Sequence, residues 1–374
     1  MTFLLMFAIG LGAPISPLLA SKMGASWIEI GLMGSAWGIV FTLSAFVTGR
    51  VSDRIGRKPI LAMSSALSAL AALCFLRATS VTELIAIKGI EGLAWACFWP
   101  PMEALATETA DAQETGRGIG LVTTVYAFGF TISSFAGGYM TGFFGFPLAF
   151  STYFAFAALS IFAVWFVETP KHTDHRMMIS PSGLARRLFS RTLAVANVLG
   201  ACYTFGLATI MILLSVFAAG FGISVFWIGI AFSAFWVGRI LGAAFAGAAS
   251  DRLGRRSVAL TGMTIGCIGF VMIMSATSLL LIVAGALLAG LSIGGIFPVN
   301  VAIIADDIEP ELRGAAMGFF EMNCAIAFMV ASALGGISAE LVNSRTPYAL
   351  SAVVFASCVV VLGVLLPHRP RKQQ

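Results

Sequence analysis

The sequence GRVSDRIGRK at residues 49–58 is repeated, with few changes, as GAASDRLGRR at residues 247–256. Each copy follows one long apolar run and leads into another. A short charged segment between two apolar runs of about 20 residues is typical of a loop between membrane spans. Since such a segment occurs twice, we expect a membrane protein built from two related halves.

The composition leads to the same class of protein. The 374 residues are 59% hydrophobic and only 10% charged, whereas soluble domains carry about 25% charged residues. Twelve spans of about 20 residues would use roughly 240 residues, which leaves only short loops. The composition therefore excludes a purely soluble protein and predicts that the lipid bilayer is the chain's main partner.

Apolar runs separated by charged or turn-forming residues predict an all-α polytopic fold with twelve transmembrane helices. The expected spans are 2–20, 28–50, 59–78, 82–106, 117–141, 147–168, 192–218, 225–248, 257–275, 279–305, 315–336 and 347–366. We expect a cytoplasmic linker at 169–191 between an N-terminal six-helix bundle (1–168) and a C-terminal six-helix bundle (192–374). The first run has no basic leader, so we interpret it as an uncleaved span.

One constant shift aligns the two halves. Adding 198 to a residue number converts Asp53 to Asp251 and Gly31 to Gly229. The same shift holds without a gap from the second span through the fifth, where it converts Gly138 to Gly336. An ungapped match over this length indicates internal duplication and predicts pseudo-symmetric bundles.

The basic residues predict the orientation in the membrane. Seventeen of the 22 lysines and arginines fall on the side that carries the two charged hairpins. Only Lys22, Arg77 and Arg345 fall on the other side, and two more lie within spans. The positive-inside rule therefore predicts cytoplasmic hairpins and cytoplasmic termini, most simply in the plasma membrane. The net charge of +5 reflects this orientation, and we expect no nucleic-acid partner.

The remaining reactive residue types do not form a pattern of catalysis or metal binding. The six cysteines are far apart inside apolar runs, and the three histidines lie in hydrophilic stretches. No GxxxxGK[ST] phosphate loop occurs. We therefore expect a chain that is not an enzyme and has no cofactor, no metal and no ATP-driven pumping.

On these hairpins the chain resembles the major facilitator superfamily, whose signature is a Gly-x-x-x-Asp-Arg-x-Gly-Arg-Lys hairpin between the second and third spans. The resemblance covers essentially the whole chain. It implies a secondary transporter that opens a central cavity alternately to each side, with its substrate near the middle of the membrane.

The resemblance implies that the hairpins are gates. Asp53 would pair with Arg57 and face the amino end of the eleventh span, where the helix dipole favours an anion. Gly49 would allow close approach of neighbouring backbones, and Gly56 the tight turn. The full set of gating candidates is Gly49, Asp53, Arg54, Gly56, Arg57, Lys58, Gly247, Asp251, Arg252, Gly254, Arg255 and Arg256.

Two departures from the family pattern weaken the comparison with its drug antiporters. The fifth span of those antiporters carries a central Gly-Pro, where this chain has Ser133-Ser134. The fourth span often carries an arginine four residues before a glycine, and here that position is Lys88, before Gly92.

Charged side chains within spans are costly and therefore mark functional candidates. On the fourth span a single helical stripe contains five residues, namely Lys88, Glu91, Trp95, Trp99 and Glu103. We interpret the stripe as a cavity wall. Lys88 and Glu91 are spaced to pair within the helix, which would make them a local ion pair instead of substrate ligands.

Glu103, Glu321 and Arg239 have no obvious partner in sequence. Each carboxylate could be solvated in a cytoplasmic vestibule or could titrate during transport, because burial disfavours the charged form. Arg239 lies near the middle of the eighth span and keeps its proton. It needs an anionic substrate or a carboxylate from Glu321, Glu91 or Glu103.

Further polar and aromatic residues could line the site. Asn197, Asn300, Asn323 and Tyr126 could bind a ligand or form bonds between helices. Trp37, Trp95, Trp99, Phe235, Trp236 and Phe297 could form an aromatic wall, although packing explains any one of them.

Three functions remain open at the level of sequence. The first is proton-coupled export of small amphipathic or drug-like compounds by a monomer. The second is uptake or exchange of a small organic anion or metabolite, with Arg239 as its charge partner. The third is a membrane receptor or assembly protein without flux, against which the duplicated gating hairpin argues.

Overall fold

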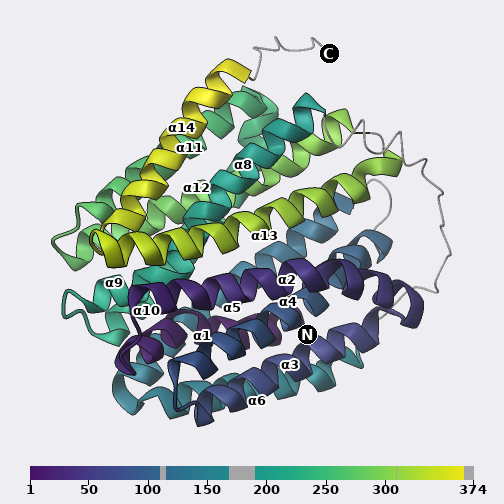
Figure 1. Ribbon diagram of the computed structural model, residues 1–374. Helices are drawn as coiled ribbons and strands as arrows, with labels where there is room; N and C mark the ends of the chain where they lie inside the picture. Colours follow the sequence, from purple (N-terminus) through teal and green to yellow (C-terminus); the bar gives the residue numbers. More distant parts are fainter. Residues whose placement is uncertain (110–114, 168–189, 309, 366–374) are drawn as a thin grey trace.

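The computed structural model describes residues 1–109, 115–167, 190–308 and 310–365. Throughout these ranges the regular elements are helices, and they form twelve rods in two groups of six (Figure 1). The first group contains α1 (Thr2–Lys22), α2 (Trp27–Ile55), α3 (Arg57–Arg77), α4 (Val81–Thr109), α5 (Thr115–Phe144) and α6 (Phe146–Val164).

The second group repeats this order with a divided first rod. It contains α8 (Arg191–Ala208), η1 (Thr209–Leu213) and α9 (Leu214–Ala219) as one rod, then α10 (Val225–Leu253), α11 (Arg255–Met274), α12 (Leu279–Asp307), α13 (Pro310–Leu341) and α14 (Thr346–Leu365). The predicted twelve-helix membrane fold is therefore confirmed. Most of the expected linker, 169–191, lies outside the described residues.

Eleven of the rods are long and apolar enough to cross a membrane. The exception is α4, whose apolar character is interrupted by the charged stripe. Several helices extend beyond their apolar runs, because a helix continues as long as its backbone hydrogen bonds form, whether or not lipid surrounds it. The expected hairpin loop at 49–58 is an example, since α2 continues to Ile55 and only Gly56 separates it from α3.

The seventh rod is continuous in direction but contains a π-helical turn at Thr209–Leu213. The Thr209 hydroxyl hydrogen-bonds the Phe205 carbonyl at 3.1 Å and the Ser351 hydroxyl of α14 at 2.9 Å. Single π turns inside α-helices are frequent at functional sites. This turn was not predicted, because its residues continue the apolar run of the span.

The two groups meet through two glycine contacts. Where α2 crosses α13, a Cβ atom on Gly31 would lie 3.0 Å from the Gly336 Cα. Where α5 crosses α10, a Cβ on Gly138 would lie 2.7 Å from the Gly229 Cα. The shift of 198 converts one contact into the other, so the internal duplication predicted from the sequence also relates the two interfaces. Both crossings lie on the side of the molecule opposite to the two charged hairpins, which we call the distal side.

A hydrogen bond across the first of these interfaces adds to the closure of the distal side. The carboxylate of Glu340 on α13 accepts the backbone N–H of Trp27, the first residue of α2, at 2.8 Å. Figure 1 shows α2 and α13 side by side here and farther apart toward the hairpin side.

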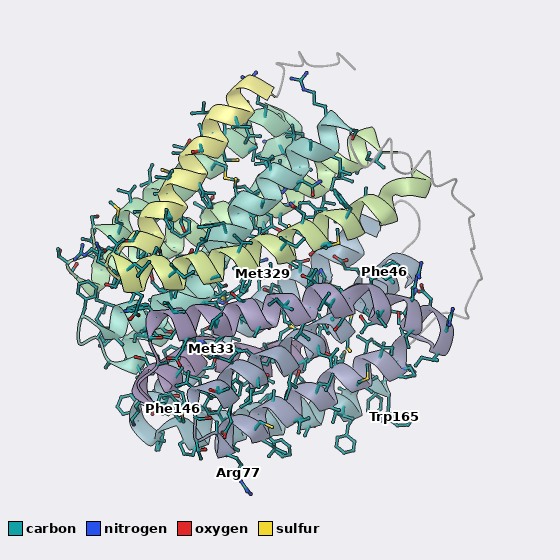
Figure 2. All side chains as sticks on the ribbon, in the orientation of Figure 1. Met33, Phe46, Arg77, Phe146, Trp165 and Met329 are labelled. Carbon is teal, nitrogen blue, oxygen red and sulfur yellow. The ribbon has the colours of Figure 1, made fainter. Side chains whose placement is uncertain are left out.

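Large apolar side chains cover the outer surface. Phe46 and Trp165, both labelled in Figure 2, are 65% and 78% exposed. Such exposure on most helices is expected for a protein surrounded by lipid. The chain is thus a multi-pass integral membrane protein.

Two Gly→Ala variants should change stability in opposite directions. A methyl group at Gly31 would lie 2.5 Å from the Ser332 carbonyl oxygen, so Gly31→Ala should destabilise by about 1–3 kcal/mol through overpacking. A Cβ atom added at Gly318, in the same interface helix α13, would meet no atom within 4 Å. Gly318→Ala should therefore stabilise by up to ~1 kcal/mol through helix propensity. Thermal unfolding of the purified variants tests this, and equal effects at both positions would contradict the interface.

Candidate functional site

A cavity lies between the two groups of helices. It has an empty volume of about 1230 Å³, part of which is continuous with solvent. Side chains from α1, α2, α4 and α5 line it on one side, and side chains from α8, η1, α10, α12 and α13 on the other. Its wall is mainly aromatic and aliphatic, with Lys88, Glu91, Arg239 and Glu321 as its charged groups.

The duplication extends to the cavity wall. The shift of 198 relates seven pairs of lining residues: Ile9 and Leu207, Ala13 and Met211, Phe41 and Arg239, Trp99 and Phe297, Thr123 and Glu321, Tyr126 and Cys324, and Phe130 and Phe328. Most pairs are uncharged in both halves. In two of them one half alone carries a charge, Arg239 opposite Phe41 and Glu321 opposite Thr123.

Four of the five residues of the stripe on α4 line the cavity. Lys88, Glu91, Trp95 and Trp99 are all part of the wall. The fifth residue, Glu103, is half-buried beside the Trp99 indole and is not part of the wall. The Trp95 and Trp99 rings are parallel, 6.2 Å apart between centroids and 3° between planes.

Lys88 and Glu91 form the predicted local ion pair. The Lys88 Nζ lies 2.7 Å from Glu91 Oε2, and both side chains are less than a tenth exposed. The Tyr153 hydroxyl on α6 donates to Glu91 Oε1 at 3.0 Å, an interaction that the sequence did not indicate. The ion pair is thus both buried and part of the cavity wall, which joins the two alternatives left open by the sequence.

Arg239 lies between aromatic rings. Its guanidinium donates to the Tyr126 hydroxyl at 3.4 Å and lies 5.3 Å from the Tyr126 ring centre and 4.9 Å from that of Trp236. Among the residues that the structure describes, no carboxylate lies within the 4.0 Å of an ion pair with Arg239. Glu91 is held by Lys88, and Glu321 acts on Arg239 only through space.

Two carboxylates from different halves lie near each other, Glu321 in the cavity wall and Glu103 outside it. Glu321 on α13 and Glu103 on α4 are close enough to repel. Arg239 acts electrostatically on Glu321. Glu321 in turn lies close enough to act on Glu103, Tyr126, Tyr203 and Cys324 from the surrounding helices. Because α13 starts at Pro310, Glu321 lies about three turns into its helix rather than near its end.

The three asparagine candidates do not line the cavity. Asn323 donates to the Asn197 backbone carbonyl at 2.9 Å, which is the bond between helices considered for it. Asn197 donates to the Leu193 carbonyl of its own helix. Asn300 is fully buried, and its side-chain amide has no hydrogen bond within the described structure.

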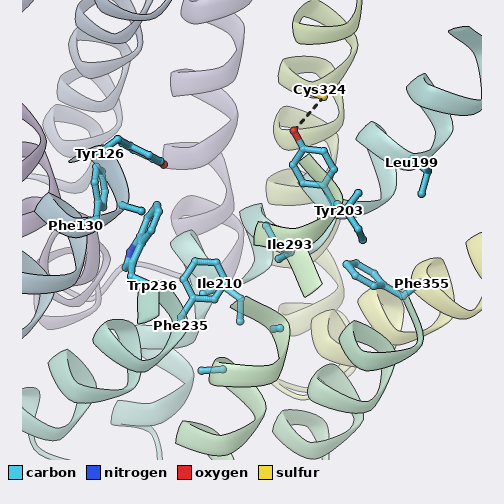
Figure 3. Close-up of a cluster of buried hydrophobic side chains, with 14 of the residues drawn as sticks. Tyr126, Phe130, Leu199, Tyr203, Ile210, Phe235, Trp236, Ile293, Cys324 and Phe355 are labelled. Carbon is cyan, nitrogen blue, oxygen red and sulfur yellow. Dashed lines mark hydrogen bonds between the residues drawn. The ribbon is translucent and has the colours of Figure 1, made fainter. Parts of the chain in front are cut away.

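Five of the six aromatic candidates lie in the cavity wall. Trp37, Trp95, Trp99, Trp236 and Phe297 line the cavity, whereas Phe235 is buried behind it. Figure 3 shows Tyr126 and Phe130 of α5 against Trp236 of α10, with ring centroids 5.1 Å and 4.5 Å from Trp236.

Several lining residues were not predicted. Tyr203 hydrogen-bonds the Cys324 thiol at 3.8 Å (Figure 3), and Thr204 and Phe41 also line the cavity. They occur in uniformly apolar runs, where nothing separates a cavity residue from a packing residue. The shift of 198 would have found Phe41, as the counterpart of Arg239.

The two hairpins share one geometry. Gly56 and Gly254 have φ of 96° and 87°, so both provide the expected tight turn. Arg57 hydrogen-bonds Ser52, at 2.7 Å, and the predicted partner Asp53. In the second copy Arg255 hydrogen-bonds Ser250, the counterpart of Ser52.

The predicted close approach at Gly49 is wrong for this structure. A Cβ at Gly49 would meet nothing nearer than 4.0 Å, and at Gly247 nothing within 4 Å. Gly49 and Gly247 lie on the hairpin side, opposite to the glycine crossings. The two halves are not in close contact around them. The side chains of Asp251 and of residues 310–315 lie outside the described residues, and the contact of Asp53 with the amino end of α13 stays a prediction.

The other basic hairpin residues lie at the surface or hold neighbouring helices. Arg54 and Arg252 are exposed. Lys58 donates to the Trp165 carbonyl at 3.4 Å, and Arg256 to the Gly363 carbonyl at 2.7 Å. These bonds connect each hairpin to the last helix of its own half.

A central cavity between two duplicated six-helix halves is the architecture of a secondary transporter. The family model of the Major Facilitator Superfamily matches residues 1–189 and 196–374. The chain therefore belongs to the Major Facilitator Superfamily, as its hairpins predicted.

Similar proteins cover nearly the whole chain. An uncharacterized transporter of this superfamily from Methanocaldococcus jannaschii is 22% identical, over 98% of this chain and 96% of the relative. A probable 4-methylmuconolactone transporter of Cupriavidus pinatubonensis is 24% identical, over 94% and 84% of the two chains. The crystal structure of the nucleoside transporter NupG has a TM-score of 0.77 at 14% identity, over 98% of each chain, and supports the fold alone.

The buried ion pair should be sensitive to loss of one partner. Glu91→Leu leaves Lys88 charged in an apolar wall and should destabilise by about 3–5 kcal/mol. The double variant Lys88→Met/Glu91→Leu removes both charges and should recover most of that loss. Thermal unfolding of the purified variants measures the difference; a double variant as unstable as the single one would contradict the pairing.

Proposed function

We propose that this transporter works by alternating access, moving small amphipathic compounds through the central cavity with protons as the coupling ion. The observation that carries the proposal is the pair Glu321 and Glu103, two carboxylates from opposite halves, of which Glu321 lines the cavity and Glu103 lies beside it within electrostatic range. Rigid movement of the halves would change the surroundings of both groups in each cycle. A group that alternates between an apolar and a hydrated environment can take up and release a proton.

The substrate would bind where both halves contribute to the wall. Aromatic rings supply apolar contact, and Arg239 and Glu321 supply charge. In this proposal the glycine crossings hold the distal side closed while the cavity is accessible from the hairpin side, which the charge distribution predicts to be cytoplasmic. A monomer in the plasma membrane would suffice, because both halves of the cavity come from one chain.

Whether the proton and the substrate compete for the cavity or bind together depends on the charge of the substrate. If the substrate is neutral or cationic, a proton on Glu321 competes with it, which favours proton-driven export. If the substrate is an anion, a proton on Glu321 removes a like charge beside Arg239, so anion and proton bind together. The first case corresponds to the first candidate function, export of drug-like compounds. The second case corresponds to the second candidate, uptake or exchange of an organic anion.

The second candidate is favoured by Arg239, which has no carboxylate at ion-pair distance in the described structure. A probable 4-methylmuconolactone transporter among the relatives also supports a small organic compound as substrate.

Replacing the two carboxylates tests the coupling. Glu321→Gln should abolish pH-gradient-driven flux in proteoliposomes while substrate exchange without a gradient continues, because an amide cannot carry the proton. Glu103→Gln should reduce gradient-driven flux or shift its pH dependence. Unchanged gradient-driven flux in both variants would overturn the coupling.

Arg239 separates the two candidates. For an anionic substrate, Arg239→Ala should lower transport by about tenfold or more, the scale of a lost charged hydrogen bond. Arg239→Lys keeps the charge and should retain part of the activity. Transport that is indifferent to both substitutions would exclude Arg239 as the charge partner, and with it the second candidate.

A further inference from the structure

The surroundings of Arg239 restrict the chemistry of the ligand. A guanidinium has five N–H donors and no acceptor, and the described structure gives Arg239 one side-chain hydrogen bond, to the Tyr126 hydroxyl at 3.4 Å. Arginine keeps its charge in proteins. A group that accepts two hydrogen bonds and carries a negative charge, such as a carboxylate, matches the donors that are left.

A flat aromatic surface lies next to this charge. The parallel Trp95 and Trp99 indoles stand one helical turn apart on α4. Their ring centres lie 5.8 Å and 5.9 Å from the centre of the Tyr126 ring, at interplanar angles of 64° and 63°. The Arg239 guanidinium lies 5.3 Å from the same ring centre. The Tyr126 ring therefore has the positive charge and both indoles as neighbours.

The duplication argues that this arrangement serves a ligand. Contacts that build the frame, such as Gly31 with Gly336, recur in the other half as Gly229 with Gly138. The charge of Arg239 and the pair of indoles do not recur, since only Trp99 has an aromatic counterpart, Phe297. The counterpart of Arg239 is Phe41, and the counterpart of Trp95 is Ile293, a fully buried residue outside the cavity wall.

We propose that the cavity binds a single-ring aromatic monocarboxylate, with its carboxylate on the Arg239 guanidinium and its ring against the Trp95 and Trp99 indoles. The inference rests on the proposed transport through this cavity and deepens its second candidate, an organic anion, by naming the substrate class. Tyr126, a neighbour of the guanidinium and of both indoles, would hold them in position relative to each other. A planar ring fits because offset stacking and edge contacts with indoles are available only to flat ligands.

Binding to the purified full-length protein, without a pH gradient, tests the class of ligand. Benzoate is the probe, and isothermal titration or quenching of tryptophan fluorescence gives its affinity. Benzamide has the same ring without the charge, and cyclohexanecarboxylate has the charge without the flat ring. Benzoate should bind about tenfold or more tightly than benzamide, and several-fold more tightly than cyclohexanecarboxylate. Equal binding of benzoate and benzamide would overturn the proposal.

Matched variants locate the site. Arg239→Gln should lower benzoate affinity by about tenfold or more and leave benzamide affinity unchanged. Trp95→Leu should remove the preference for benzoate over cyclohexanecarboxylate. Arg77→Gln, an exposed arginine on the distal side that projects from the molecule in Figure 2, serves as the control and should bind benzoate like the unmodified chain.

The outcomes separate this inference from the transport proposal. Benzoate affinity that is unchanged in Arg239→Gln would contradict the site even if proton-driven flux of another compound is found. Benzoate binding at Arg239 without any flux in proteoliposomes would contradict transport and leave the site in place. If Arg239→Gln does not fold, the comparison of benzoate with benzamide on the unmodified chain decides the question.

Discussion

A charge within a membrane span must be paired, solvated or used, because the hydrocarbon region cannot stabilise it. This chain holds Lys88, Glu91, Glu103, Arg239 and Glu321 within its spans, and its structure brings all five to or beside one cavity. Lys88 and Glu91 neutralise each other. Arg239, Glu321 and Glu103 interact through space or through aromatic neighbours, and these three therefore carry the proposals on substrate charge and proton coupling.

Comparison of the two duplicated halves shows which of these charges occur in one half only. Glycine crossings, hairpin turns and most of the cavity wall occur in both halves, related by the same shift of 198 residues. Features needed to hold two bundles together and to let them move are expected in both copies. A residue needed to recognise an asymmetric ligand is needed only once, as Arg239 and Glu321 are.

Much of the fold could be predicted because helix length and charge distribution are properties of the sequence. Twelve spans, the duplication and the stripe on α4 all follow from apolar runs and helical spacing. Helix ends were less accurate, since α2 continues through the charged residues before Gly56. The role expected for Gly49 was wrong in this structure, because a close approach depends on which side of the molecule is closed.

The site could be predicted from the sequence only where charged residues interrupt an apolar span. Charges in an apolar run stand out, whereas Tyr203 and Thr204 are indistinguishable from packing residues until the helices are placed in space. The asparagines were overestimated as ligands because a polar residue within a span can equally bond to a neighbouring helix, as Asn323 does. The π turn in the seventh rod has no counterpart in apolar periodicity and emerged only from the backbone.

Alternating access requires the two halves to separate on the distal side in every transport cycle. A disulfide between α5 and α10 tests it directly, because a Cβ on Gly142 would lie 3.5 Å from the Phe226 Cβ, within the range for a disulfide. We expect Gly142→Cys/Phe226→Cys, in a chain whose six native cysteines are replaced, to lose flux in proteoliposomes when oxidised and to regain it on reduction. Full flux through the completely cross-linked protein would contradict alternating access at this interface.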